Sequence, residues 1–181
     1  YITGRHYDKV HQYSLSTPWD ISTGSFDSDF SVAAQDTNPT DMIFYDNGTK
    51  MLIIGYTNAK IYQYSLSVGY DISTAAYDNV SYSVSSEDGA PGNFAFSPDG
   101  TQMFMTAWYS TSVKQYDLST AYDITTLSFT TTVFDPTAQV TENIQSVAFS
   151  SDGAKMYLAT YGDDLPGAAG GDYGRVYQYS T

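Results

Sequence analysis

The 181-residue sequence contains no cysteine, only two histidines, and only seven lysines and arginines together. The lack of cysteine excludes disulfides, thiolate metal sites and a cysteine nucleophile. A formal net charge of −13 disfavours nucleic acid and anionic membranes as partners, because both are bound through clustered cations. No apolar run is long enough to cross a membrane as a helix, so we predict no membrane insertion.

Catalytic motifs are missing as well. The sequence has no Gly-x-Ser-x-Gly, no His-Glu-x-x-His and no phosphate-binding loop. Both histidines, His6 and His11, lie close to the first residue, and His11 falls at a repeat position that holds Tyr62 in the next copy. We therefore predict that the protein is not an enzyme, and we assign it no catalytic residue and no cofactor.

Tyrosine is abundant instead, with 18 residues, and serine and threonine are frequent. This composition favours β-strands over helices. The chain also repeats itself. The stretch Val113–Thr126 has near copies at Val10–Thr23 and Ile61–Thr74, and a further copy begins at Val176.

A second repeated unit has a period of about 52 residues. It starts at Phe44, Phe96 and Phe149, and each copy continues through Asn-Gly or Asp-Gly into an apolar strand. Asn-Gly or Asp-Gly between two alternating apolar runs is a strong signal for a β-hairpin.

Four strands are predicted in each period. In the copy at 92–134 they are strand A at Asn93–Ser97, strand B at Gln102–Ala107, strand C at Ser112–Leu118 and strand D within Leu127–Phe134. Four short antiparallel strands per repeat, without a helical pattern, are typical of a β-propeller blade. We therefore predict an all-β protein, a β-propeller of four-stranded antiparallel blades.

The hairpin sequence resembles a known family. Phe96-Ser97-Pro98-Asp99-Gly100, followed by an aromatic and apolar strand, is similar to the hairpin of YVTN-type and WD40-like bacterial propeller repeats. The resemblance extends over the whole chain at the level of repeats, and it implies the propeller fold. Some propellers of this kind hydrolyse lactones with a metal held by acidic and amide side chains. Those ligands have no residue-by-residue match here, so a metal-dependent lactonase-like hydrolase is an alternative function.

The predicted blades are 1–34 (strands B, C and D), 38–86, 92–134 and 144–181 (strands A, B and C), or roughly three and a half blades. Three arrangements are open: part of a larger ring of about seven or eight blades, a four-bladed ring with incomplete ends, or a ring completed by a second chain. Open sheet edges invite pairing with other chains. Self-association through blade edges, in a purely structural fibre or shell, is therefore another alternative.

Features that recur in every copy are interpreted as scaffold. Asp20, Asp71 and Asp123 are predicted to form turns in which their carboxylates accept local backbone N–H groups. The aromatic residues before them are predicted to cover blade edges or to pack between blades, and strand C glutamines to satisfy polar groups between blades. These residues are Trp19, Tyr70, Tyr122, Gln12, Gln63, Gln115 and Gln178.

The B–C and D–A loops differ between copies. In a propeller they lie on the face opposite the A–B and C–D loops, and variable loops on a rigid scaffold are where binding usually occurs. Aromatic rings there can stack on sugars, while amides and carboxylates hydrogen-bond the hydroxyl groups. We therefore predict a non-catalytic module, extracellular or on a cell or virion surface, that binds a glycan or a protein. The candidate ligand-binding residues are Tyr7, Tyr56, Asn58, Glu87, Asp88, Trp108, Tyr109 and Tyr161.

Two further kinds of site are suggested. A Gly- and Asp-rich insertion breaks the last period, and it is either a solvated loop or a Ca²⁺ site with Asp163, Asp164 and Asp172 as ligands. Asn47 and Asn79 stand in Asn-x-Ser/Thr sequons and are candidate N-glycosylation sites.

Overall fold

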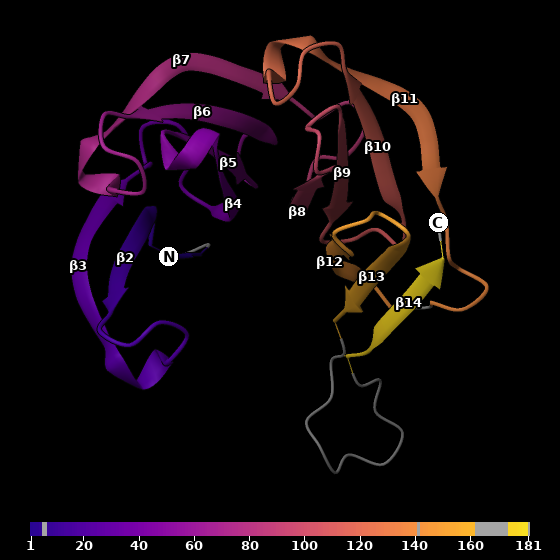
Figure 1. The fold of residues 1–181 in the computed structure, drawn as a ribbon. Coiled ribbons are helices and arrows are strands. Elements are labelled where there is room, and N and C mark those ends of the chain that lie inside the picture. The colour runs from indigo at the N-terminus through magenta and orange to yellow at the C-terminus, as the bar shows by residue number, and fades with distance from the viewer. Residues whose placement is uncertain (5–6, 141, 162–173, 181) are drawn as a thin grey trace. The chain divides into compact units, whose positions relative to one another are not determined.

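A computed structural model describes residues 1–4, 7–140, 142–161 and 174–180. In these residues the regular structure consists of fourteen strands and four one-turn 3-10 helices (Figure 1). None of the described helices is long and apolar enough to cross a bilayer. The prediction of an all-β protein is confirmed. The chain forms two compact units, Tyr1–Ser83 and Val84–Thr181, which are called unit 1 and unit 2 below.

Unit 1 contains two antiparallel sheets. Sheet 1 has the order β1-β2-β3 and is formed by β1 (Ile2–Thr3), β2 (Lys9–Leu15) and β3 (Gly24–Ser31). Sheet 2 has the order β4-β5-β6-β7 and is formed by β4 (Pro39–Tyr45), β5 (Lys50–Gly55), β6 (Lys60–Leu66) and β7 (Ala75–Ser83). The 3-10 turns are η1 (Ile21–Thr23), η2 (Asp46–Gly48) and η3 (Ile72–Thr74).

Unit 2 also contains two antiparallel sheets. Sheet 3 runs β8-β9-β10-β11 and is formed by β8 (Pro91–Phe96), β9 (Gln102–Ala107), β10 (Val113–Leu118) and β11 (Leu127–Phe134). Sheet 4 runs β12-β13-β14 and is formed by β12 (Ile144–Phe149), β13 (Lys155–Thr160) and β14 (Val176–Ser180). The turn η4 (Ile124–Thr126) precedes β11. Each sheet is open at both edges in the part of the chain that the structure describes.

The strands follow the predicted repeat closely. Strands β8, β9, β10 and β11 are the predicted strands A, B, C and D of the copy at 92–134, with ends that differ by at most two residues. The A–B hairpins turn at Gly48, Gly100 and Gly153, whose φ angles are 78°, 72° and 72°. This left-handed conformation is open to glycine without steric cost, which explains the Gly in each hairpin.

The turn between strands C and D is called the corner. Its aspartate caps the 3-10 turn, because the Asp20, Asp71 and Asp123 carboxylates accept the N–H two residues later at 3.0, 3.0 and 2.9 Å. The predicted role of these three residues as turn formers is confirmed. The pKa of the Asp20 carboxyl lies below its usual range because Ser22 donates side-chain and backbone hydrogen bonds to it.

The predictions for the aromatic residues and glutamines were partly wrong. Tyr70 and Tyr122 lie over the glycine of their own A–B hairpin, while Trp19 is 97% exposed because sheet 1 has no such hairpin among the described residues. Gln12 does bridge two sheets, since its Oε1 accepts the N–H of Ile72 at 3.0 Å. Gln63 instead bonds within its own sheet.

Hydrogen bonds define two ends of each unit. At the hairpin end, the corner N–H of Tyr70 donates to Gly48 O at 3.0 Å, and that of Tyr122 to Gly100 O at 2.9 Å. The opposite end, called the loop end, carries the B–C and D–A loops. There the N–H of Trp108 donates to Ala90 O at 2.8 Å, so the predicted pairing of loops on two faces is confirmed.

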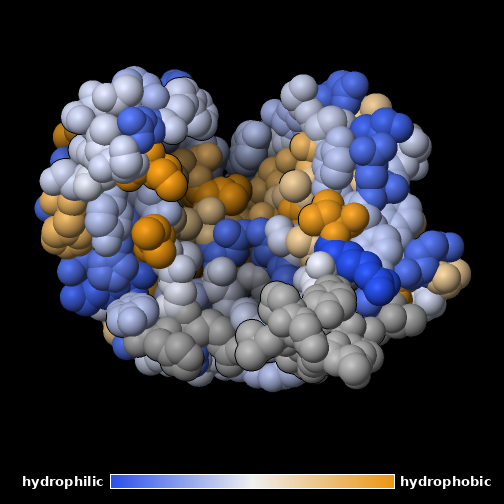
Figure 2. Space-filling view, turned by 90° about the horizontal axis from the view of Figure 1, so that it is seen from below, coloured by the Kyte–Doolittle hydropathy of each residue, from blue (hydrophilic) through white to orange (hydrophobic). Residues whose placement is uncertain are grey.

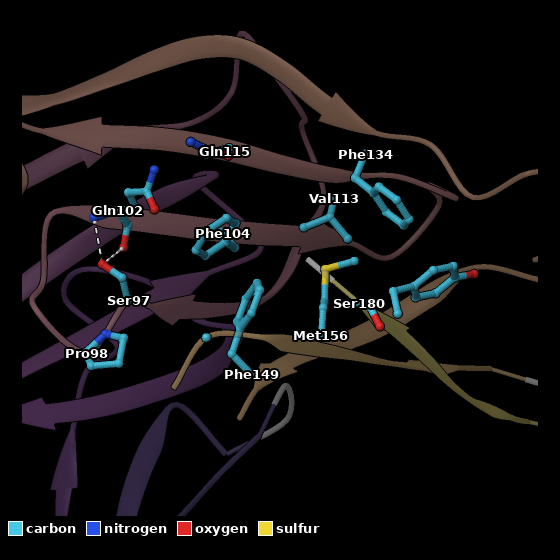
Figure 3. A pocket seen from close by; sticks show the side chains of 12 residues that line it. Ser97, Pro98, Gln102, Phe104, Val113, Gln115, Phe134, Phe149, Met156 and Ser180 are labelled. Carbon is cyan, nitrogen blue, oxygen red and sulfur yellow. Dashed lines mark hydrogen bonds between the residues drawn. The ribbon is translucent and has the colours of Figure 1, made fainter. Parts of the chain in front are cut away.

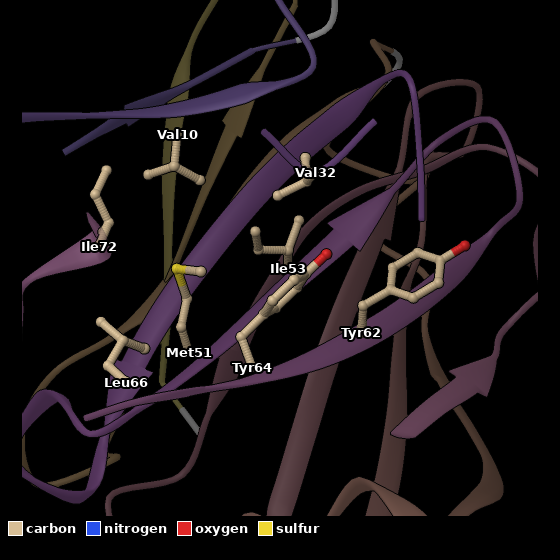
Figure 4. Packing of buried hydrophobic residues seen from close by; sticks show 8 residues of the cluster. All are labelled: Val10, Val32, Met51, Ile53, Tyr62, Tyr64, Leu66 and Ile72. Carbon is tan, nitrogen blue, oxygen red and sulfur yellow. The ribbon is translucent and has the colours of Figure 1, made fainter. Parts of the chain in front are cut away.

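Each unit has its own apolar core between its two sheets. In unit 1 strands β2, β5 and β6 and turn η3 supply most of the buried side chains, and Figure 4 shows eight of them converging. They are Val10, Val32, Met51, Ile53, Tyr62, Tyr64, Leu66 and Ile72. The corresponding cluster of unit 2 consists of Val113, Val140, Ile144, Val147, Met156 and Leu158.

Candidate functional site

A buried aspartate organises the loop end of unit 1. Asp36 is 2% exposed, and its carboxylate accepts the backbone N–H groups of Asn38 at 2.8 Å, Thr57 at 3.2 Å and Asn58 at 2.9 Å. The side-chain amide of Asn58 donates to Gln35 O at 2.7 Å. The D–A loop therefore holds the next B–C loop rigidly, and this internal bond already uses the amide of the candidate Asn58.

The equivalent aspartate of unit 2 has a different partner. Asp88 pairs with the Lys114 ammonium at 3.1 Å, and the two side chains are only 21% and 11% exposed. Its other carboxylate oxygen accepts the N–H of Ala90 at 3.0 Å. Glu87 accepts a long hydrogen bond of 3.5 Å from the Tyr116 hydroxyl. The candidate residues Glu87 and Asp88 thus serve the packing of unit 2.

Exposed tyrosines remain available at the loop ends. Tyr7 and Tyr109 are each 71% exposed and Tyr161 is 55% exposed, whereas Tyr56 and Trp108 are half-buried. In the face drawn in Figure 2, hydrophobic residues form separate patches among hydrophilic ones. Isolated exposed aromatic rings on hydrogen-bonded loops suit a ligand with both apolar and polar faces.

The remaining sequence candidates fall in two groups. Asp163, Asp164 and Asp172 lie outside the described residues. Asn47, at the hairpin turn, and Asn79, at a bulge in β7 with a φ of 60°, are both exposed. Within residues 1–4, 7–140, 142–161 and 174–180, no three His, Cys, Asp or Glu side chains are grouped to hold a metal.

Unit 2 contains a groove that the sequence candidates do not include. It has a volume of about 460 Å³ and lies between sheets 3 and 4 at the hairpin end. Figure 3 shows aromatic and apolar side chains around it, with glutamines and serines at its rim. Its lining residues are Ser97, Pro98, Gln102, Phe104, Val113, Gln115, Phe134, Phe149, Gly153, Met156, Tyr179 and Ser180.

Two ring pairs form the walls of this groove. Phe104 and Phe149 are 4.4 Å apart between centroids, and Phe134 meets Tyr179 edge-on at 4.9 Å. The Tyr179 hydroxyl is buried and has no hydrogen-bond partner among the described residues, and burial raises its pKa. The comparable hydroxyl in unit 1, that of Tyr64, donates to Gln35 at 3.2 Å.

The repeat itself carried a signal for this groove. Gln115 lies at the glutamine position that recurs in strand C, and Phe149 and Gly153 lie at recurring positions of the second repeated unit. Placing these recurring positions at one end of the sheets would have pointed to the hairpin end, while the search for variable loops pointed to the other end.

Comparison with known proteins supports the fold. No protein-family model and no curated protein matches the sequence. Among solved structures, a candidate 6-phosphogluconolactonase from Bacteroides fragilis superposes with a TM-score of 0.56 and 15% identity, over 84% of this chain and 42% of that one. A second, from Bacteroides uniformis, gives 0.53 and 14%, over 91% and 53%.

A eukaryotic structure is also similar. Sqt1 from Chaetomium thermophilum, a WD40 propeller, has a TM-score of 0.50 and 14% identity, over 87% of this chain and 37% of that one. The chain thus spans between about a third and about half of the length of these proteins. At such identities the likeness concerns the fold alone, and this chain has an all-β fold of antiparallel sheets like those of propellers.

Proposed function

We propose that this protein is a non-catalytic binding module of the YVTN-type propeller class, with its sheets as blades and its loop ends as the contact surface. The observation that carries the proposal is a difference between the hairpin ends and the loop ends. The repeated aspartates and tyrosines of the hairpin ends make internal contacts, whereas Tyr7, Tyr109 and Tyr161 at the loop ends remain exposed.

Tyr109 and Tyr161 are the exposed rings of the proposed contact surface in unit 2. The backbone beside Tyr109 is fixed, since the N–H of Ile144 donates to Ser110 O at 3.0 Å. The backbone N–H of Tyr161 donates to Asn143 O, also at 3.0 Å. An exposed ring on a fixed backbone loses little conformational freedom on binding, which favours stacking on a glycan or on a protein side chain.

A glycan array tests this proposal directly. We expect the protein to bind a subset of glycans, and Tyr109→Ala to weaken that binding about tenfold, the value of one aromatic stacking contact. The matched control is Trp19→Ala, which removes an equally exposed aromatic residue from a hairpin end. Equal losses in both variants would contradict the assignment of the loop end.

A metal-dependent lactonase-like hydrolase is the second candidate, favoured by the structural likeness to two candidate 6-phosphogluconolactonases. The two functions are separated by incubation with 6-phosphogluconolactone. Acid release that a chelator abolishes supports the hydrolase. A rate equal to that in buffer alone supports the binding module.

The proposal also includes the partners and the location of the protein. With a net charge of −13 we expect no nucleic-acid or membrane partner, and the exposed Asn47 and Asn79 sequons fit an extracellular or surface location. Self-association through open sheet edges is the structural alternative. It predicts a mass in light scattering that rises with protein concentration.

A further inference from the structure

The A–B hairpin of unit 1 carries a different turn residue from those of unit 2. Asn47 occupies the position that Asp99 and Asp152 hold, and a glycine follows in each copy. The other five asparagines of the sequence precede proline, alanine, valine, phenylalanine and isoleucine. An amide before glycine has a chemistry of its own, because no Cβ hinders the next backbone nitrogen from attacking the side-chain carbonyl carbon.

In unit 2 the turn side chain is held in place. The Asp99 carboxylate accepts the Ser97 hydroxyl at 2.6 Å, the Thr101 N–H at 3.1 Å and the Thr101 hydroxyl at 2.8 Å. Asp152 accepts the Ser150 hydroxyl at 2.5 Å and the N–H two residues later at 3.0 Å. Hydrogen bonds, chiefly from the serine hydroxyls, lower the pKa of both carboxyl groups. A carboxylate held in this way is a poor target for a backbone nitrogen.

In unit 1 the corresponding bonds go to the preceding residue. The Thr49 hydroxyl donates to Asp46 O at 2.7 Å and to the Asp46 carboxylate at 3.1 Å, and the Thr49 N–H donates to Asp46 O at 3.1 Å. Tyr45 stands where both hairpins of unit 2 have serine, so that hydroxyl donor is missing. The Asn47 side chain is exposed and makes no hydrogen bond with a described residue. Its amide can therefore turn toward its own backbone.

The backbone of this turn is left-handed over three residues. Asp46, Asn47 and Gly48 have φ angles of 50°, 52° and 78°. The ψ of 34° at Asn47 directs the Gly48 nitrogen away from the Asn47 side chain, so attack requires the peptide plane between them to turn over. Glycine accepts the accompanying change in its φ without steric cost.

The corner of sheet 2 restrains this rotation. The Tyr70 ring lies over Gly48, where an added Cβ would come within 2.4 Å of it, and the Tyr70 N–H donates to Gly48 O at 3.0 Å. A Cβ added at Gly69 would lie 2.5 Å from Asn47 O, so this carbonyl also packs against the corner. The turn thus combines a reactive pair of residues with a cover that slows their reaction.

We propose that Asn47 is a modification site, at which the side-chain amide is lost spontaneously through a ring with Gly48, and that the Tyr70 ring limits the rate. The Gly48 nitrogen gives its proton to the solvent and bonds to Asn47 Cγ. The Cγ–Nδ2 bond breaks, and Nδ2 takes up a proton and leaves as ammonia. Water then opens the five-membered imide at either carbonyl carbon, which gives aspartate or isoaspartate. The net reaction consumes water and releases ammonia.

The two products differ in their effect on unit 1. Aspartate at position 47 is the residue that the hairpins of unit 2 carry, and it removes the Asn-Gly-Thr sequon that starts at Asn47. Isoaspartate lengthens the main chain before Gly48, so the Tyr70 N–H loses its alignment with Gly48 O. Aged protein is therefore a mixture of an intact and a distorted hairpin, each with an added negative charge.

Mass spectrometry of proteolytic peptides, after incubation of the folded protein at mildly alkaline pH, tests the proposal. The exchange of NH for O should be about tenfold faster at Asn47 than at Asn79, because the β-branched Val80 hinders attack there. Asn79 is a matched internal control, since it is also exposed, has a φ of 60° and stands in a sequon. Val80→Gly should raise the rate at Asn79 about tenfold.

Two further variants separate the reaction from its cover. Asn47→Gln keeps the amide but should react far more slowly, because its closure forms a six-membered ring. Tyr70→Ala should speed the reaction at Asn47 about threefold, since Gly48 then opens more often, and circular dichroism checks that this variant is folded. After long incubation the isoaspartate fraction of the parent protein should melt several degrees lower, whereas incubated Asn47→Gln protein should melt as before.

Two results would overturn the proposal. One is an equal rate at Asn47 and Asn79 in the folded parent protein. The other is no reaction at Asn47 in the folded protein while the urea-unfolded chain reacts, which would mean that the corner blocks ring closure completely. An unchanged rate in Tyr70→Ala would overturn the part assigned to its ring.

Discussion

The core of unit 1 and the groove of unit 2 are built from the same repeat positions, but among the described residues only the core of unit 1 is filled. Tyr64 is fully buried with its hydroxyl bonded, whereas its counterpart Tyr179 is half-buried with a hydroxyl that lacks a described partner. In unit 1 the corner after β6 and the start of β7 pack against this core, where Tyr77 lies 5.5 Å from the ring of Tyr64. The corner is therefore a part of the core as well as a connection.

A second contrast lies between sheets 1 and 2. Their corners share the sequence Asp-Ile-Ser-Thr, and the capping bonds of Asp20 and Asp71 are both 3.0 Å. Even so, Ile21 is 89% exposed and Ile72 is 0% exposed. Local sequence thus forms the corner by itself, and burial depends on whether a neighbouring sheet covers it.

The largest expected effect comes from the two isoleucines. Ile72→Ala should destabilise unit 1 by about 3 kcal/mol, because it leaves a cavity in a closed core. Ile21→Ala is the matched control, with an expected change below about 0.5 kcal/mol. Urea unfolding followed by hydrogen exchange in each unit measures both. Similar losses in the two variants would mean that exposure does not distinguish the corners.

The two loop-end aspartates should give the next effect. Asp36→Ala removes the acceptor of three backbone N–H groups and should cost about 2.5 kcal/mol. Asp88→Ala leaves the Lys114 ammonium, whose side chain is only 11% exposed, without its carboxylate and also removes the acceptor of the Ala90 N–H, so a loss of about 2 kcal/mol is expected, between the values for surface and buried pairs. Thermal unfolding of both variants gives the order. A larger loss for Asp88→Ala would show that the ion pair matters more than the loop cap.

Much of the fold could be predicted because its signals are local. The Asn-Gly and Asp-Gly turns identify the hairpins, and the spacing of Phe44, Phe96 and Phe149 identifies the period. These features depend on residues close in sequence and on backbone geometry that few residues adopt.

The site could be predicted less well because contacts between distant residues decide it. Nothing near Glu87 in the sequence shows that Tyr116 bonds to it, or that Asp88 pairs with Lys114 from the next strand C. The groove was missed for the same reason. In the sequence, groove residues such as Phe104 and Phe149 look like ordinary core residues, because the sequence does not show which side chains lie beside them.

The two hairpin glycines of unit 2 differ in the described atoms that an added Cβ would meet. Gly100→Ala should cost about 2 kcal/mol, because alanine is strained at a φ of 72° and its Cβ would lie 2.3 Å from the Tyr122 ring. Gly153→Ala has the same strain without the clash, so about 1 kcal/mol is expected. Thermal melts of both variants check this order, and an equal cost would place a ring over Gly153 as well.

The smallest effect concerns the Asp78 carboxylate, which accepts hydrogen bonds from Lys50, Gln63 and Ser65 in unit 1. Burial acts to raise the pKa of Asp78, but hydrogen bonds from Ser65, Gln63 and Lys50 outweigh it and lower that pKa. A lowered pKa in the folded state contributes stability above the unfolded value of about 4, and this contribution is lost as the pH falls through the folded value. Asp78→Asn should therefore reduce stability at pH 7 and leave it nearly unchanged at pH 2, as measured by urea unfolding at both values. Thr130→Ala, at the matching bulge of β11, is the control and should show no such pH dependence. An Asp78→Asn loss that is equal at the two pH values would mean that the carboxylate's charge contributes nothing to this cluster.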